Sequence, residues 1–555
     1  MKKTTKQFIS LFLALALIVT TFFAMPTTVS AASKPTSKKA TLKITDTKIS
    51  GFKKIEGTLS VNGKSVIAYG KNKKGQNVYA YSTNGKKFSK ATLLGIEGEV
   101  DYRVSKNNIY VFAKNDKGYT TAYKYASNAK NLSSSPVINL TEKFSLPAGC
   151  STDDLRCYSN SGTNGKFYMT AYYSGYVNGD YVSYDYSAVL NGNNVTVVNL
   201  TELIQNQMPN CDISYVDLSR DYASNSYNAV AYGTGWDKET YKRVSFIFKT
   251  SDGINFTPIN APYAYEDATY QYEWCNSKLF AYVNYYNYNN PNTAPMTSDN
   301  KGIFYTYSNG NWEQCTTSKA CPTGFFMGYR ADAYYNDGTS SKDFFVAQYN
   351  IENATQILYT ANGKSWKSLP KLSYNKTAKS KSYQLSHVGF YKSSGGTYAT
   401  ETYNIPNKEN QSYLVISKLS KNKWKTLKAL TIARTTKSAY STTLYGKNPA
   451  LIYNNGKTTV GYNLSTKKSY KMPFKYTYNS IYSGDTSVYW QGKNLYVTRN
   501  GYKNVTKVTL KIGSKTLNTK ITDNGYGYIK KTSYTYLICG GKMYYVPYAQ
   551  LSKIK

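Results

Sequence analysis

The chain contains one histidine among 555 residues, and this scarcity excludes several kinds of site. A zinc site built from the usual cysteine and histidine ligands is not expected. A Ser-His-Asp arrangement would have to use His387, and no GxSxG sequence surrounds a candidate serine. The phosphate-binding GxxxxGK[ST] and dinucleotide-binding GxGxxG patterns are absent in strand-to-helix context. We therefore predict no metal, no cofactor and no catalytic residue of these classes.

Long hydrophobic runs are confined to the N-terminus. Lys2, Lys3 and Lys6 precede the apolar run LFLALALIV, and small residues follow at Val29–Ala31. This order is typical of a signal peptide, which we assign to residues 1–31. No later run approaches the roughly 18 apolar residues of a membrane helix, and the C-terminal AQLSKIK carries no wall-sorting tail. We expect a secreted, extracellular protein without a membrane span, held at the cell wall by charge alone.

Acidic residues are few: 31 Asp and Glu stand against 69 Lys and Arg, for a net charge of +38. Removal of the signal peptide takes away three lysines and lowers the charge to +35. Such a charge draws a protein towards polyanions, so we expect an anionic glycan or wall polymer as partner. The alternative is a lysine coat that only aids solubility. The lysines are scattered singly, which argues against a specific nucleic-acid partner, and we expect a monomer.

The spacings of the seven cysteines are wrong for structural zinc sites, and the single histidine removes the usual co-ligand. Cys150 and Cys157 are close enough in sequence to form a disulfide across a single loop, as are Cys315 and Cys321. Cys211 and Cys275 could pair across neighbouring units, which leaves Cys539 over.

Leucine is sparse and no 3.6-residue apolar stripe is present, whereas 60 tyrosines fall in short runs such as SVIAY, NIYVFA and KFYMTAYY. This pattern predicts an all-β fold. The stretch YSTNGKKF, residues 81–88, recurs as FKTSDGINF, YTANGKSW and a degraded YTYSNGNW. Its Asn-Gly or Asp-Gly step supplies the positive φ of a tight turn.

Aligned on the aromatic residue that follows this turn, the units lie 47 to 61 residues apart. A period near 55 with about four strands predicts a multi-bladed β-propeller of four-stranded antiparallel blades. Seven to ten blades fit the length, with seven or eight favoured. We divide the chain into a short linker at 32–44, a propeller at 45–435, and residues 436–555, which either complete the ring with further blades or form an appended β-domain.

The repeated turn resembles the Asp-box, or BNR repeat, of sialidases and other propeller proteins. The resemblance covers roughly residues 45 to 430 and implies a structural turn on the outer rim of a blade, remote from the ligand. In the degraded copy, Ser308, Asn309, Gly310 and Trp312 follow the motif with one residue shifted. The residues that match a shortened motif are Ser82, Asn84, Gly85 and Phe88, then Thr250, Asp252, Gly253 and Phe256, then Thr360, Asn362, Gly363 and Trp366.

Ligands of propellers usually lie at the axis, on the innermost strand of each blade. Four of the seven arginines fall in the segments that should form this strand. Arginine recognises planar anions in bidentate fashion, so an axial anion site is predicted. The alternative is that each arginine bonds a neighbouring aspartate and is structural only. The predicted ligand-binding residues are Arg103, Arg156, Arg220, Arg330, His387, Asp101, Asp154 and Asp332, with other acids such as Asp217 nearby.

The resemblance also implies a sialidase, with an arginine triad, a Tyr-Glu nucleophile pair and an Asp acid. The family's FRIP-type signature is absent, however, because the chain reads GTLSVNGKSVIAYG at that place. No Tyr-Glu pair can be singled out among the tyrosines. We therefore favour non-catalytic binding over a sialidase-like glycoside hydrolase, with a protein-interaction or adhesion module as a third reading. The tyrosine-rich segments 172–186 and 284–292 are glycan-binding candidates, although packing between blades is the commoner role of such residues.

Overall fold

The structure is a computed structural model. It describes residues 32–554, except 222–225, 263–267, 276, 286–303, 315, 318–344, 352–353, 361–364, 394–395, 434–439, 445–447, 455–457, 478–479, 484–485 and 552. The predicted signal peptide and part of the segment 284–292 therefore lie outside the described residues. Within them, no helix is long and apolar enough to cross a membrane.

Strands that are consecutive in sequence form the first five sheets, each four-stranded and antiparallel. They are β3–β6 (Lys54–Val61, Ser65–Lys71, Asn77–Ser82, Thr92–Leu93), β7–β10 (Glu99–Ser105, Asn108–Lys114, Thr120–Ala126, Val137–Asn139), β11–β14 (Leu155–Thr163, Lys166–Val177, Asp180–Asn191, Asn194–Asn199), β15–β18 (Cys211–Arg220, Ala229–Asp237, Arg243–Thr250, Thr257–Pro258) and β19–β22 (Ala268–Cys275, Lys278–Tyr285, Phe304–Ser308, Asn311–Gln314).

Five further sheets follow, and the last two also take strands from the N-terminal segment. They are β23–β26 (Thr316–Thr317, Phe345–Ile351, Ala354–Thr360, Ser365–Ser373), β27–β30 (Gln384–Ser393, Gly396–Asn404, Gln411–Ser420, Lys423–Ala433), β31–β34 (Tyr440–Thr443, Ala450–Asn454, Thr459–Asn463, Ser469–Lys471), β35–β39 (Ser480–Ser483, Thr486–Gln491, Asn494–Arg499, Asn504–Ile512, Lys515–Thr516) with β1 (Thr36–Lys43), and β40–β42 (Asp523–Ile529, Thr532–Cys539, Lys542–Val546) with β2 (Thr45–Asp46).

Helices are short and lie in the connections between strands. They are α2 (Leu200–Gln207), α3 (Lys376–Ser380) and α4 (Tyr548–Leu551), together with the 3-10 turns η1 (Ala129–Asn131), η2 (Thr141–Lys143) and η3 (Thr152–Asp154).

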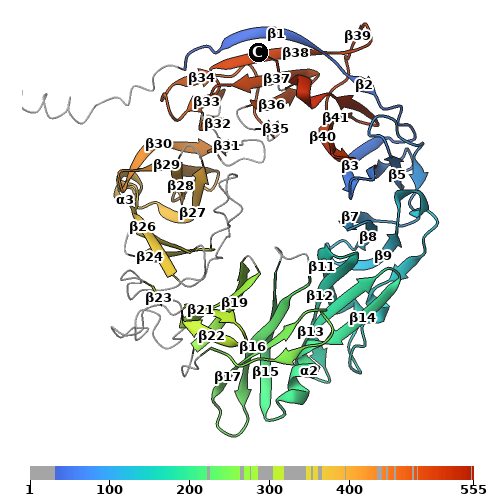
Figure 1. The fold of residues 1–555 in the computed structure, drawn as a ribbon, viewed down its shortest axis with the longest axis vertical. Helices are drawn as coiled ribbons and strands as arrows, with labels where there is room; N and C mark the ends of the chain where they lie inside the picture. The colour runs from blue at the N-terminus through green and yellow to red at the C-terminus, as the bar shows by residue number, and fades with distance from the viewer. Residues whose placement is uncertain are drawn as a thin grey trace, which may run out of the picture.

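The sheets stand side by side around a ring, and the first strand of most sheets lies nearest its middle (Figure 1). Apolar clusters fill the spaces between neighbouring sheets; one joins Tyr110 and Phe112 of β8 to Phe167 and Met169 of β12. A strand covered on both faces is apolar throughout, which explains the five consecutive buried residues 109–113 of β8. The fold is therefore an all-β propeller of four-stranded antiparallel blades. The described residues form ten sheets, not the favoured seven or eight.

The segment that contains β1 and β2 belongs to the propeller. Strand β1 pairs in parallel with β38 from Thr36↔Asn504 to Lys43↔Lys511, and β2 pairs with β42. Leu42 is buried in the same cluster as Val508 and Leu510. The predicted linker at 32–44 therefore contains a strand instead, because its alternate apolar residues cover the outer edge of the sheet that holds β38.

The last sheet of the segment 436–555 packs against the first sheet of the chain. Strand β40 packs against β3, and Ile538 and Met543 share a buried cluster with Val66 and Ala80. Two side chains of β3 reach across to the neighbouring backbone: the amides of Tyr526 and Tyr528 donate to Thr58 Oγ1 at 2.8 Å and to Ser60 Oγ at 2.9 Å. The last sheet thus contacts the first.

Two of the repeated turns share one hydrogen-bond pattern after the third strand of their sheets. In the first, the Gly85 amide donates to Ser82 Oγ at 2.9 Å, and Asn84 Oδ1 accepts from the amides of Lys86 and Lys87, both at 2.9 Å. Phe88 then folds back into the cluster beneath.

The second turn repeats these contacts with Thr250 and Asp252. The Gly253 amide donates to Thr250 Oγ1 at 2.9 Å, and Asp252 Oδ1 accepts from the amides of Ile254 and Asn255. Phe256 is buried in the same way as its counterpart.

The other two copies differ. The turn at residues 361–364 lies outside the described residues. The degraded copy forms a plain two-residue hairpin, with φ of 52° at Asn309 and 86° at Gly310. The Asn-Gly step, shifted by one residue in this copy, supplies the two central residues of the shorter turn.

Cys150 and Cys157 do not form the disulfide that their spacing suggested, whereas Cys315 and Cys321 lie outside the described residues. Cys150, Cys157, Cys211 and Cys539 carry free thiols in the described part of the chain. Cys157 is buried on β11, and burial raises the pKa of its thiol to about 12.

Candidate functional site

The predicted axial residues in the described part of the chain lie on or next to the first strands of four sheets. Asp101 and Arg103 are on β7, Arg156 on β11, and His387 is exposed on β27. Asp154 is exposed in η3, just before β11, and Arg220 ends β15. Arg330 and Asp332 lie outside the described residues.

Arg103 is bonded to the aspartate two positions before it, on the same face of β7. The Nη2 and Nε atoms of Arg103 lie 2.9 and 3.0 Å from Asp101 Oδ2, and Lys114 Nζ lies 3.9 Å from the same oxygen. The arginine side chain is 50% exposed, so this ion pair adds little stability. This arrangement is the structural alternative considered for the axial arginines.

Arg220 connects two sheets. It is 6% exposed, and its Nη1 and Nη2 atoms donate to Ser161 O at 3.0 Å and Thr163 Oγ1 at 2.9 Å. Its guanidinium lies 4.9 and 4.6 Å from the ring centres of Tyr168 and Tyr227. A ligand does not reach a side chain enclosed in this way, so Arg220 has a structural position.

Arg156 remains exposed, and in the described part of the chain it makes no ion pair. Its guanidinium lies 5.9 Å from the ring centre of Tyr119. Tyr119 in turn meets Tyr158 edge to face, with ring centres 5.5 Å apart. The cation is therefore exposed and lies beside an aromatic surface.

Cross-strand register places Arg156 beside a cavity. Arg156 pairs with Tyr172 of β12, which pairs with Asp185 of β13, so all three project from one face of this sheet. Between that face and β15 lies a cavity of about 260 Å³, which we call the tyrosine cleft. It is lined by Tyr158, Thr170, Ala171, Tyr172, Asp185, Tyr186, Leu200, Val216, Asp217 and Leu218.

Two carboxyl groups from different sheets face this cleft. Asp217 accepts hydrogen bonds from the hydroxyls of Tyr215 at 2.9 Å and Tyr232 at 3.1 Å, and from the Leu218 amide at 2.7 Å. Burial, and secondarily the negative charge of Asp217, raise the pKa of Asp185 to about 7. Asp185 therefore exchanges a proton near neutral pH.

Sequence reasoning did not select Asp185. It lies in the segment 172–186, which was chosen for its tyrosines as a glycan-binding candidate, with packing between blades as the commoner role. That segment belongs to a hairpin of two 12-residue strands, β12 and β13, with Tyr176 and Tyr181 exposed near its tip. The available signal was the alternation of polar and aromatic residues in YVSYDY, which puts Asp185 on one face.

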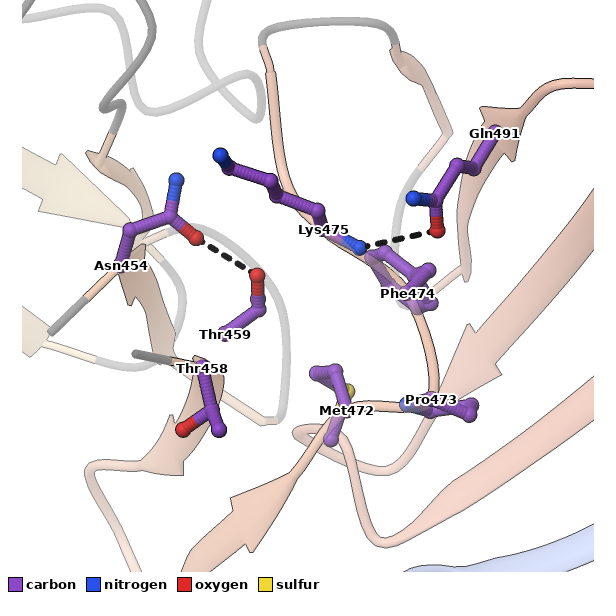
Figure 2. A pocket seen from close by; sticks show the side chains of 8 residues that line it. All are labelled: Asn454, Thr458, Thr459, Met472, Pro473, Phe474, Lys475 and Gln491. Atoms are coloured by element: carbon purple, nitrogen blue, oxygen red, sulfur yellow. Dashed lines mark hydrogen bonds between the residues drawn. The ribbon is translucent and has the colours of Figure 1, made fainter. Parts of the chain in front are cut away.

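A larger cavity of about 380 Å³ lies between the sheets β31–β34 and β35–β38 (Figure 2). Its buried polar groups satisfy one another: Thr459 Oγ1 donates to Asn454 Oδ1 at 2.6 Å, and Asn454 Nδ2 donates to Tyr476 O at 2.7 Å. Lys475 is the charged residue in its lining. With its donors and acceptors occupied, this cavity offers less to a ligand than the tyrosine cleft. The lining comprises Asn454, Thr458, Thr459, Met472, Pro473, Phe474, Lys475 and Gln491.

One Tyr-Glu pair is present that the sequence did not single out. The Tyr403 hydroxyl donates to the Glu401 carboxylate and accepts from the Asn375 amide at 3.0 Å. Tyr403 is 1% exposed and Glu401 is 2% exposed, within the sheet β27–β30. This pair is packed in the core, where a substrate does not reach it.

No protein-family model and no curated protein sequence matches the chain. The chain is similar to solved propeller-containing structures at low levels. A prolyl endopeptidase is 10% identical over 74% of this chain and 60% of that one, with a TM-score of 0.31. The propeller domain of the trilobed protease of Pyrococcus furiosus is 11% identical over 68% and 98%, with a TM-score of 0.26.

A third similar structure is the GH32 β-fructofuranosidase BmSUC1 of Bombyx mori, 11% identical over 70% of this chain and 89% of that one, with a TM-score of 0.22. The chain spans about three fifths of the length of the prolyl endopeptidase. The described sheets, rather than these scores, define the class of the protein, a β-propeller.

Proposed function

We propose that the protein is secreted and binds an anionic glycan or cell-wall polymer without cleaving it. The binding surface is Arg156 together with the tyrosines at the mouth of the tyrosine cleft. The observation that carries this proposal is the exposed Arg156 guanidinium, 5.9 Å from the Tyr119 ring and next to an open cavity.

Two physical arguments support this surface. Tyrosine rings stack on the apolar faces of sugar rings at low entropic cost because they have few rotatable bonds. An arginine held beside them adds a bidentate partner for a carboxylate, phosphate or sulfate group. The net charge, +35 once the three lysines of the signal peptide are removed, raises the local concentration of polyanions and speeds their encounter with the site.

We also propose that the turns at 82–88 and 250–256 are Asp-box repeats. The identical pattern of side-chain acceptors in both copies supports this assignment. In this reading the turns are structural, and the ligand lies elsewhere.

The test is binding of sulfated and carboxylated glycans to the wild type, Arg156→Ala and Arg243→Ala. The control removes the same charge from a residue that stacks on Trp236, 5.8 Å away. We expect Arg156→Ala to weaken binding about tenfold, the loss of one charge-assisted contact, and the control to bind like the wild type. Equal affinity of both variants, with all binding lost above about 0.3 M salt, would mean that only the lysine coat attracts the polymer.

One observation favours a second candidate, glycoside hydrolysis. Asp185 and Asp217 lie in one cleft, and the pKa of Asp185 is raised to about 7, as a general acid requires. Turnover of a panel of aryl glycosides, lost in Asp185→Asn, would establish this activity and replace the non-catalytic proposal. Binding without turnover would retain the non-catalytic one.

A further inference from the structure

The charge of the tyrosine cleft is opposite to that of the protein. The chain has 69 basic and 31 acidic residues, yet the lining of this cavity contains Asp185 and Asp217 and neither lysine nor arginine. Arg156 lies on the same sheet face, two strands away from Asp185. The site thus has a cationic edge and an anionic interior.

The two carboxylates differ in what they bind within the protein. Asp217 is oriented by Tyr215 and Tyr232, which donate to its Oδ2 atom. At Asp185, the backbone amide donates to Thr201 Oγ1, and in the described part of the chain no side chain donates to the carboxylate. The Asp185 carboxylate is therefore half-buried and accepts no hydrogen bond from a described side chain.

The groups that face Asp185 come from each element packed against it. Tyr172 lies beside it on β12, and Asp217 and Tyr215 approach from β15. None of them carries a positive charge. A half-buried carboxylate in such surroundings gains most from a ligand that brings both a cation and N–H donors.

We infer that the tyrosine cleft binds a primary ammonium group of the ligand, held between the carboxylates of Asp185 and Asp217 against tyrosine rings. Aromatic rings favour a cation near their faces, so Tyr158 and Tyr172 suit this occupant. The inference rests on the proposed function and narrows it: the glycan carries amino groups as well as anionic groups, and Arg156 takes the anionic ones.

The test compares 6-amino-6-deoxyglucose with glucose by calorimetry. The two sugars differ in one group, and an aliphatic amine, with an ordinary pKa of about 10, stays protonated throughout the pH range used. We expect the amino sugar to bind about tenfold or more tightly than glucose, and Asp185→Asn to remove this preference. The matched control is Asp180→Asn, which makes the same change at an exposed position of the same strand and should bind like the wild type.

Lowering the pH from 8 to 5.5 should weaken binding of the amino sugar about tenfold or more, because a proton then competes with the ammonium group at Asp185. Melting curves of both variants verify their folding. Equal binding of the two sugars, or an amino-sugar preference that survives in Asp185→Asn, would overturn the inference. The proposed function fails separately if the sulfated and carboxylated glycans do not bind in the Arg156 experiment while the preference for the amino sugar persists. That result would reject the anionic polymer as ligand and retain the ammonium site.

Discussion

The hydroxyl of Tyr536 donates a hydrogen bond of 2.9 Å to the carbonyl oxygen of Gly85, 451 positions away in the sequence. Tyr536 is fully buried in the last sheet, and Gly85 is in the first repeated turn of the first sheet. The aromatic rings of Tyr536 and Phe88 also meet edge to face, with their centres 5.8 Å apart. The repeated turn therefore takes part in closing the propeller as well as in ending a strand.

Tyr536→Phe should lower the free energy of unfolding by about 1 to 2 kcal/mol, because a buried carbonyl loses its donor while the ring remains. Denaturant unfolding measures this change. Tyr526→Phe is the control, since its hydroxyl donates to Ser533 Oγ on the exposed side of the same sheet. An equal effect of both substitutions would show that the bond to Gly85 adds nothing to closure.

Gly85→Ala should destabilise the protein more than Gly75→Ala. Both glycines have a positive φ, 69° and 80°, so both alanines meet the same backbone strain of about 1 kcal/mol. A Cβ at Gly85 would lie 2.5 Å from the Tyr534 ring, whereas a Cβ at Gly75 meets nothing within 4 Å. We expect a difference of about 2 kcal/mol between the variants in thermal or denaturant unfolding. Similar losses would mean that Tyr534 moves aside freely.

Local patterns predicted most of the fold. The Asn-Gly turn and the apolar run of β8 each depend on neighbours in sequence, so the blades and their innermost strands could be predicted. The pairing of β1 with β38 depends on two segments more than 450 residues apart, and no local signal marks it.

The site was harder to predict for the same reason. Arg156 and Arg220 have similar sequence surroundings, and only the contacts between sheets bury one and expose the other. Asp185 became a candidate through its register opposite Tyr172 on the neighbouring strand. Such cross-strand neighbours cannot be derived from composition.

Arg220→Met should lower stability and leave ligand binding unchanged at temperatures where the variant is folded. Methionine keeps the apolar stem between Tyr168 and Tyr227 but removes the two hydrogen bonds to β11. We expect a loss of about 2 to 3 kcal/mol, typical of buried bonds to a charged donor. Arg156→Ala should show the reverse, with weaker binding and an unchanged melting temperature. Weaker ligand binding by folded Arg220→Met would show that Arg220 takes part in the ligand site.

Glu401 should make the protein less stable as the pH rises. Burial raises the pKa of its carboxyl group to about 7 from an ordinary 4.5, although bonds from Tyr403 and the Asn375 backbone partly oppose this rise. Below about pH 4.5 the group is protonated in both folded and unfolded chains. Between that pH and about 7 the unfolded chain releases the proton while the folded chain keeps it, so the unfolded state binds fewer protons and stability falls.

The size of this effect is on the order of 3 to 4 kcal/mol, since the pKa rises by about 2.5 units and each unit corresponds to about 1.4 kcal/mol. Unfolding in urea at a series of pH values measures it. Glu401→Gln, which stays neutral, should flatten the decline between pH 4.5 and 7 by that amount, whereas Glu409→Gln at an exposed position should leave the profile as it is. A stability profile of Glu401→Gln that follows that of the wild type would contradict this prediction. The buried carboxyl group would then be ionised in the folded protein, because the hydrogen bond from Tyr403 offsets the cost of burying its charge.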